Sequence, residues 1–176
     1  MEDAPAGRRR FLSIATSAIG AAIGAVIAYP LVRYALYPAG RKVVTSSAEP
    51  IDAIAINALV PGAAPRRVQL LARSTRDAWS TTTNVPVGAA WVRRTEAGDV
   101  EVLSASCPHL GCAVDFDPGS KSYKCPCHKS AFGVSGDKIE GPAKRGLDPL
   151  PYTIVDGRVK ITLVRFRADV AEREPA

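Results

Sequence analysis

The sequence predicts a mainly β protein, in which one N-terminal transmembrane helix precedes an antiparallel β-sandwich domain. Three observations predict this fold class. An uncharged apolar stretch runs from Phe11 to Val32, short segments of β character separated by Gly, Pro and Asp recur after residue 51, and no amphipathic helical pattern of useful length follows the apolar stretch. The length of 176 residues suits a membrane segment plus one compact domain of average size.

The apolar stretch is long enough to cross a bilayer, so residues 11–36 are predicted to form an uncleaved anchor. At a rise of about 1.5 Å per residue, Phe11 to Val32 reaches about 33 Å, which matches the hydrocarbon core. The alternative is a cleaved secretory signal, but the apolar core of a signal is shorter, at about 7–15 residues. Interfacial aromatic residues are expected near the far end of an anchor, where Tyr29, Tyr34 and Tyr37 lie.

Three arginines at positions 8–10 precede the anchor and predict its orientation. Positively charged flanks stay in the cytoplasm, so residues 1–10 are predicted to be cytoplasmic. The rest of the chain is then on the periplasmic or outer side of a bacterial inner (plasma) membrane. The segment Gly7–Leu12 also resembles a twin-arginine (Tat) export signal, with Arg8 and Arg9 as the pair. That resemblance implies export of a domain that has already folded.

The segment after the anchor predicts a tether followed by a β domain. Residues 37–50 contain several Pro, Gly and Ser with little periodicity, so they are predicted to be flexible. Residues 51–168 are predicted to form the domain, and residues 169–176 a C-terminal tail. The candidate strands in the domain are Val68–Ala72, Ala89–Arg94, Val100–Ser104, Tyr152–Val155 and Val159–Val164.

The net charge of +6 does not predict a nucleic-acid interface. Such an interface needs Lys and Arg gathered on one face, usually among stacking aromatic residues. Outside positions 8–10 the basic residues alternate with acidic ones, so nucleic acid is excluded as a partner.

All four cysteines and both histidines of the chain lie between Cys107 and His128. They form two segments, Cys107-Pro108-His109-Leu110-Gly111-Cys112 and Cys125-Pro126-Cys127-His128-Lys129-Ser130. Zinc would take four of the six side chains, and a plant-type iron–sulfur cluster would take four thiolates at a different spacing. A third, mixed arrangement uses all six: two Cys on one iron, two His on a second iron, and two Cys in a disulfide.

The two segments closely resemble the Rieske signature, in which each loop supplies one Cys and one His. The resemblance implies one [2Fe-2S] cluster of the Rieske type, carried by a Rieske domain with a cluster-binding subdomain. It assigns Cys107 and Cys125 to one iron, His109 and His128 to the other, and a disulfide to Cys112 and Cys127. Such a disulfide is consistent with an exported domain, because thiols stay reduced in the cytosol.

The same resemblance implies roles for the residues around the ligands. Ser130 matches the serine that donates a hydrogen bond to a bridging sulfide, and such a donor raises the reduction potential. High-potential members carry a tyrosine two residues further on, where this chain has Phe132. The cluster is therefore expected at a lower potential, which suits menaquinol. Leu110 and Lys129 are expected at the docking tip.

The segment Gly141–Leu147 resembles the proline loop that covers the cluster in quinol–cytochrome c reductases, which gives Gly141, Pro142 and Ala143 a covering role. His128 matches the position that contacts quinol. The resemblance therefore implies the iron–sulfur subunit of a cytochrome bc-type complex. Such a subunit accepts one electron from quinol at cytochrome b and passes it to a c-type cytochrome, within a dimeric multi-subunit complex.

Two other functions compete with this one. The small Rieske subunit of an exported molybdenum oxidase, of the arsenite-oxidase type, is also exported by the twin-arginine route, but it needs neither a docking tip nor a long tether. A structural zinc module either leaves Cys112 and Cys127 unexplained or leaves both histidines without a role. In each redox case the chain is an electron-transfer subunit of an oxidoreductase and is not catalytic alone.

Overall fold

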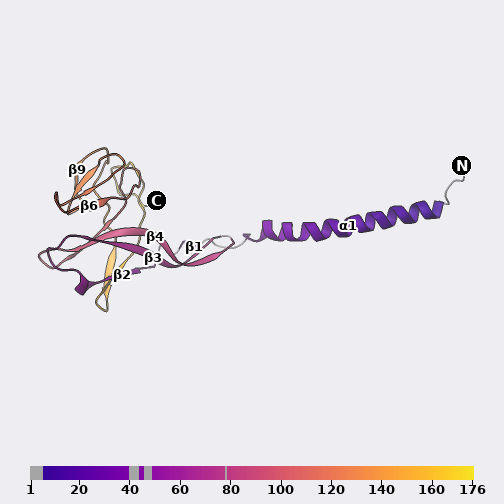
Figure 1. Cartoon of the computed structure of the whole chain (residues 1–176), viewed down its shortest axis with the longest axis horizontal. Coiled ribbons are helices and arrows are strands. Elements are labelled where there is room, and N and C mark those ends of the chain that lie inside the picture. Colours follow the sequence, from indigo (N-terminus) through magenta and orange to yellow (C-terminus); the bar gives the residue numbers. More distant parts are fainter. Residues whose placement is uncertain (1–5, 40–43, 46–48, 78) are drawn as a thin grey trace. The chain divides into compact units, whose positions relative to one another are not determined.

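The computed structural model describes residues 6–39, 44–45, 49–77 and 79–176. Their internal contacts divide the chain into two units (Figure 1). One unit contains the N-terminal helix and the segment Arg76–Ser80, and the other contains the rest of the β domain.

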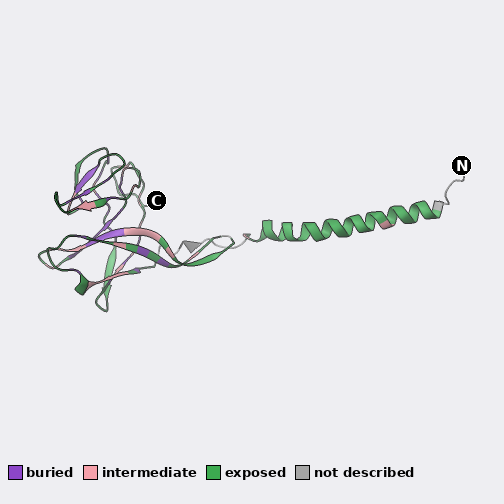
Figure 2. Cartoon of the chain, viewed as in Figure 1, coloured by how far each residue is buried: buried purple, intermediate pink, exposed green. Residues whose placement is uncertain are grey.

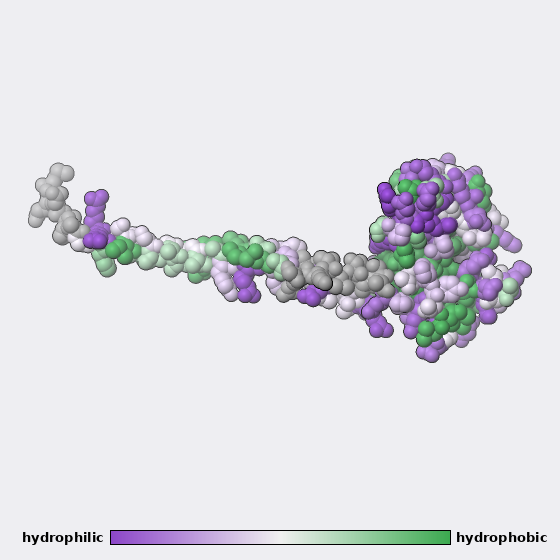
Figure 3. Space-filling view, turned by 180° about the vertical axis from the view of Figure 1, so that it is seen from behind, coloured by the Kyte–Doolittle hydropathy of each residue, from purple (hydrophilic) through white to green (hydrophobic). Residues whose placement is uncertain are grey.

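The N-terminal unit is built on one long helix, α1 (Ala6–Leu36). The helix begins before the predicted anchor and includes the arginines at positions 8–10. Its side chains are almost all exposed (Figure 2), and Gly7–Leu36 is long and apolar enough to cross a membrane. Figure 3 shows hydrophilic side chains at the N-terminal end of this helix and mainly apolar ones beyond it. Pro30 stands in the last turns, where a helix tolerates it in a membrane.

The β domain contains three sheets, and every strand pairing of known register is antiparallel. The first sheet has the order β1 (Val44–Thr45), β3 (Arg66–Arg76), β4 (Thr81–Arg94) and β5 (Val100–Ser104). The second sheet has the order β10 (Tyr152–Val155), β11 (Arg158–Ile161) and β2 (Ile51–Ala55), and the short 3-10 helix η2 (Ile56–Ala58) follows β2. The predicted mainly β fold class is confirmed.

The third sheet carries the cysteine-containing segments. It has the order β6 (Asp115–Asp117), β7 (Ser122–Lys124), β8 (Ala131–Gly133) and β9 (Lys138–Glu140). Each strand has three residues, which is too short to show the alternation that identifies a strand. This explains why the strands predicted from the sequence include none between residues 105 and 151.

Two strands are longer than the predicted ones. β3 extends on both sides of Val68–Ala72, and β4 begins at Thr81, well before Ala89. The added residues are mostly exposed and polar. Hydrogen bonds to the neighbouring strand therefore explain the extra length of β3 and β4, because these residues bury no continuous apolar face. Within the predicted tether, Val44–Thr45 joins the first sheet as β1, while residues 40–43 and 46–48 lie outside the described residues.

The domain has two hydrophobic cores. The first is formed by strands of the first and second sheets and includes Leu70, Val92 and Ile161. The second lies with the third sheet and includes Trp91, Tyr123 and Phe132. Trp91 belongs to β4, and its indole N–H donates to the Val114 carbonyl at 3.1 Å. The cluster-binding part therefore has a core of its own, attached to the first sheet through a buried, hydrogen-bonded indole.

Candidate metal centre

Two six-residue loops, Cys107–Cys112 and Cys125–Ser130, are built in the same way. We call them the first and second cluster loops. In each, the N–H of the first residue donates to the carbonyl of the sixth, from Cys107 to Cys112 at 2.7 Å and from Cys125 to Ser130 at 2.9 Å. In each, the fifth residue has a positive φ, +80° at Gly111 and +58° at Lys129. Both loops therefore fold back tightly, with the side chain of the first residue buried.

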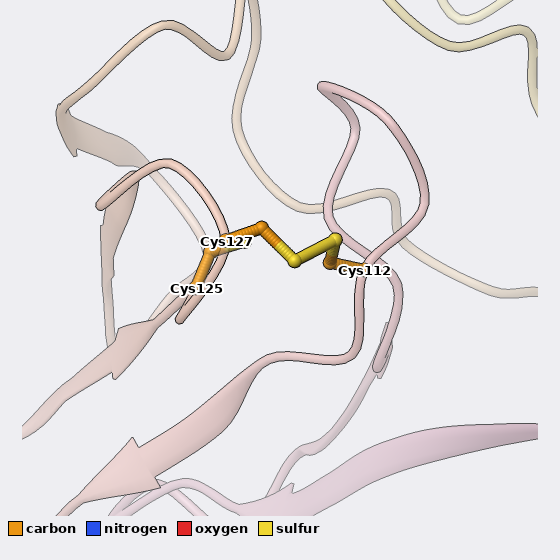
Figure 4. A group of neighbouring side chains, drawn as sticks. All are labelled: Cys112, Cys125 and Cys127. Atoms are coloured by element: carbon orange, nitrogen blue, oxygen red, sulfur yellow. A yellow bond between two sulfur atoms is a disulfide. The ribbon is translucent and has the colours of Figure 1, made fainter.

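A disulfide between Cys112 and Cys127 joins the two loops (Figure 4). The sulfur atoms are 2.10 Å apart and the two Cα atoms 6.6 Å. The sulfur of Cys125 lies within 4.8 Å of both. These three cysteines are nevertheless no three-thiolate metal site, because two of the sulfurs are bonded to each other. Cys125 is the one free thiol of the group.

Cys107 and Cys125 are the two free cysteines, and both are buried. Burial raises the pKa of the Cys107 thiol, and the neighbouring sulfur of Cys125 raises it further. The main-chain N–H of His109 and the Ser130 hydroxyl act in the opposite direction, because they hydrogen-bond the Cys107 sulfur. A buried thiol with donors aimed at its sulfur, as at Cys107, suits a thiolate ligand, since a bound cation compensates for the hydration that is lost on burial.

The two histidines of the cluster loops face each other. The ring centroids of His109 and His128 are 4.8 Å apart, and the rings meet edge to face at 89°. Nδ1 of His109 is buried and is the only such side-chain N or O atom without a hydrogen-bond partner among the described residues. A buried polar atom left unpaired costs free energy, so this nitrogen indicates a ligand.

The donor set fits the cluster that the sequence implies. Two free thiols and two imidazoles are present beside one disulfide. Two cysteines and two histidines are the ligands of a Rieske-type [2Fe-2S] centre. The assignment of Cys107 and Cys125 to one iron, and of His109 and His128 to the other, stays a prediction.

The predicted covering loop contacts the second cluster loop through Ser130. The Ser130 side chain is buried, and its hydroxyl accepts a hydrogen bond from the Ala143 N–H at 3.2 Å. A Cβ atom at Gly141 would lie 2.4 Å from the Ser130 Cα. Only glycine permits this approach, and the φ of +90° at Gly141 also favours glycine. Pro142 lies between these contacts and is exposed.

The other predicted site residues divide by exposure. Leu110 is 59% exposed, and His128 and Lys129 are exposed as well, so these three side chains are accessible at the loop tips. Phe132 is fully buried in β8, in the second core. The predicted docking positions are therefore open to a partner, and Phe132 is shielded from solvent.

Sequence reasoning missed the ion pair that anchors the end of the covering loop. Arg145 and Asp148 are both buried, with side-chain exposures of 5% and 7%. The guanidinium donates to both carboxylate oxygens, at 2.8 and 2.9 Å, and this bond raises the pKa of Arg145. An Arg three residues before an Asp is common on protein surfaces, so the sequence held no signal that this pair is buried.

Comparison with known proteins gives a consistent result. A family described as "Rieske [2Fe-2S] domain" matches residues 66–151. The chain is 31% identical to the cytochrome b6-f complex iron-sulfur subunit of Gloeobacter violaceus, over 91% of this chain and 84% of that protein. It is 32% identical to the ubiquinol-cytochrome c reductase iron-sulfur subunit of Blastochloris viridis, over 97% of this chain and 98% of that protein.

A third relative uses a different quinol. The chain is 26% identical to the menaquinol:cytochrome c reductase iron-sulfur subunit of Geobacillus thermodenitrificans, over 92% of this chain and 94% of that protein. These similarities extend over 91–97% of the chain, and not over the Rieske domain alone. The chain therefore belongs to the family of Rieske [2Fe-2S] iron–sulfur subunits of cytochrome bc-type complexes.

Proposed function

We propose that this chain accepts single electrons from a quinol at cytochrome b and passes them to a c-type cytochrome. The observation that carries the proposal is the facing pair of imidazoles beside two buried free thiols, with a buried His109 nitrogen that lacks a partner. The named relatives, subunits of quinol–cytochrome reductases, support the same electron path.

In this proposal Cys107 and Cys125 hold one iron, and His109 and His128 hold the other. A cluster held by this ligand set supplies one-electron redox chemistry at a higher potential than an all-cysteine cluster. His128 is exposed, so its ring is accessible to a quinol hydroxyl. A quinol releases protons as well as electrons, and the exposed His128 ring is the proposed acceptor of one proton.

The loop tips are the proposed docking surface. Leu110 of the first cluster loop offers an exposed apolar contact, and Lys129 of the second offers a positive charge. Cytochrome b and the acceptor cytochrome would meet this surface in turn. Residues 37–50 are the proposed tether for that movement, between an anchor at 11–36 and a Rieske domain at 51–168.

The proposed quinol is menaquinol. Hydrogen-bond donors near the sulfurs raise the potential, and Ser130 is one such donor. Phe132 occupies the position where high-potential relatives have a tyrosine, and it has no hydroxyl to donate. The cluster should therefore have a lower reduction potential than those relatives, and menaquinol, a lower-potential quinol, suits such a cluster.

The proposed location is a bacterial inner membrane, with the Rieske domain on the periplasmic or outer side and residues 1–10 in the cytoplasm. The arginines at positions 8–10 support this orientation through the positive-inside rule. They also support export by the twin-arginine route. A disulfide that persists in an oxidising compartment agrees with both. The proposed assembly is a dimeric multi-subunit complex.

The test is a potentiometric titration of the membrane-bound protein, followed by electron paramagnetic resonance at several pH values. We expect a reduced two-iron signal of the mixed Cys/His type, with a midpoint potential that falls at alkaline pH. A pH-independent signal of the all-cysteine type, or bound zinc without a signal, would overturn the assignment of His109 and His128. Co-purification with cytochrome b separates this function from that of a molybdenum-oxidase subunit.

A further inference from the structure

The last residues of the chain form a short hairpin, which we call the C-terminal hairpin (residues 165–176). The Arg167 N–H donates to the Glu174 carbonyl at 2.9 Å, and the Ala176 N–H donates to the Arg165 carbonyl at 2.8 Å. An ion pair between the Arg167 and Glu174 side chains, at 2.7 Å, lies beside these bonds. The segment predicted to be a tail is thus paired with the residues that precede it.

The turn of this hairpin contacts the first cluster loop. The Asp169 N–H donates to the Pro108 carbonyl at 3.0 Å. Pro108 is buried and stands between Cys107 and His109, the two proposed ligands of this loop. Asp169 has a φ of +56°, which directs the turn but is unusual for a residue other than glycine. The hairpin therefore holds the main chain of the first cluster loop between its two ligands.

The same turn contacts the covering loop. The Arg145 guanidinium donates to the Val170 carbonyl at 2.6 Å while it also pairs with Asp148. Lys144 forms an ion pair with Asp169 at 3.4 Å, but both side chains are about half exposed, so that pair contributes little. Two bonds matter most. One is the main-chain bond from Asp169 to Pro108, and the other is the bond from the Arg145 side chain to the Val170 carbonyl, because a buried group left without its partner is costly.

These contacts complete a connection between the two cluster loops. The covering loop is bonded to the second cluster loop through Ala143 and Ser130, and to the C-terminal hairpin through Arg145. The hairpin is bonded to the first cluster loop through Asp169. This non-covalent path joins the two loops in addition to the Cys112–Cys127 disulfide.

We propose that the C-terminal hairpin is a clasp that holds the first cluster loop in place independently of the disulfide, with Asp169 and Arg145 as its positioning residues. The inference rests on the proposed ligand roles of Cys107 and His109. Its consequence is that the loops keep their arrangement when the disulfide is reduced. Opening the clasp and reducing the disulfide together frees the first loop far more than either change alone.

The test compares two variants of one residue in the cluster-loaded full chain. Asp169→Pro removes the N–H and cannot adopt a positive φ, so it opens the clasp. Asp169→Gly keeps the N–H, accepts the positive φ and removes only the carboxylate, so it is the matched control. After disulfide reduction we expect cluster loss to a chelator, measured by visible absorbance, to be about tenfold faster in Asp169→Pro than in the wild type. Asp169→Gly should match the wild type.

Electron paramagnetic resonance and amide hydrogen exchange provide two further tests of the clasp. With the disulfide intact, Asp169→Pro should lose its cluster at nearly the wild-type rate. Its electron paramagnetic resonance line shape should nevertheless change, which a general loss of stability would not produce. If Asp169→Pro does not fold, amide hydrogen exchange on the wild-type chain replaces it, and the Asp169 N–H should be protected. Wild-type release kinetics in reduced Asp169→Pro, or an unprotected Asp169 amide, would refute the clasp. A spectrum of the all-cysteine type would instead refute the ligand assignment, while amide protection would still report on the clasp.

Discussion

The Ser130 hydroxyl accepts a hydrogen bond from the Ala143 N–H at 3.2 Å, and as a donor it lowers the pKa of the Cys107 thiol. One side chain therefore bonds the covering loop to the second cluster loop and favours the thiolate of a proposed ligand in the first. Because the hydroxyl accepts from Ala143, its own proton is free to point at sulfur. Ser130 is thus expected to affect both the stability of the domain and the midpoint potential of the cluster.

Replacing Ser130 with Ala should separate these two effects. The buried Ala143 N–H loses its acceptor, which should cost about 1–3 kcal/mol in the free energy of unfolding. The midpoint potential should fall, because a donor that stabilises the reduced state is gone. Urea unfolding and a redox titration measure the two. Ser122→Ala is the control, since Ser122 is also a buried serine but bonds Ser120; it should leave the potential unchanged.

A substitution at Gly141 should disturb the contact between the covering loop and Ser130 from the other side. In Gly141→Ala the new Cβ would lie 2.4 Å from the Ser130 Cα, so the covering loop must move away. Gly157→Ala is the matched control, because Gly157 also has a positive φ, of +71°, but nothing lies within 4 Å of its Cβ position. We expect about 1–2 kcal/mol of destabilisation in the control, from φ strain alone, and a larger loss with faster cluster release in Gly141→Ala. Equal losses in the two variants would mean that the loop does not depend on this contact.

The ligand-type residues of the site were predictable from the sequence, whereas most of the contacts that hold the two cluster loops in place were not. Six ligand-type side chains at Rieske spacing identify the two loops because ligand identity is a local property of the chain. The anchor was predicted for the same reason, since the apolar content of one continuous segment is enough to indicate a span. The helix simply extends further toward the N-terminus than the apolar residues do.

The contacts that hold the loops were not predictable. The bond from Asp169 to Pro108 joins main-chain groups far apart in the sequence, and main-chain donors leave no residue signature. The three-residue strands of the third sheet are too short for periodicity. The buried pair Arg145–Asp148 has the composition of a surface pair, and only the tertiary structure removes it from water.

The lowered pKa of Asp117 should make the stability of the domain depend on pH. Hydrogen bonds from Lys124, Ser120 and the Gly119 N–H lower the pKa of its carboxyl well below the usual value. A lowered folded-state pKa stabilises the fold above the unfolded-state pKa, about 4, and that contribution is lost as the pH falls through the folded-state value. Asp117→Asn should therefore lower the melting temperature at pH 7, and the difference from the wild type should shrink as the pH falls below about 4.

The partner of Asp117 provides the control for this effect. Lys124 is the largest cause of the lowered pKa, and the two residues pair across β6 and β7. Lys124→Gln should therefore reproduce part of the loss, and the double variant should lose less than the sum of the two. Melting curves by far-ultraviolet circular dichroism at pH 7 and pH 3 measure this. Additive losses, or a difference that is constant with pH, would contradict the assignment.

Phe132 carries the prediction that bears most directly on the choice of quinol. Phe132→Tyr adds one hydroxyl at a fully buried position of β8. A donor near a ligand sulfur stabilises the reduced state, so the midpoint potential should rise. Phe116→Tyr is the control, because Phe116 packs against the same core but is only partly buried; its potential should stay at the wild-type value. An unchanged or lowered potential in Phe132→Tyr would remove the argument for menaquinol, since the missing hydroxyl would then have no part in setting the potential.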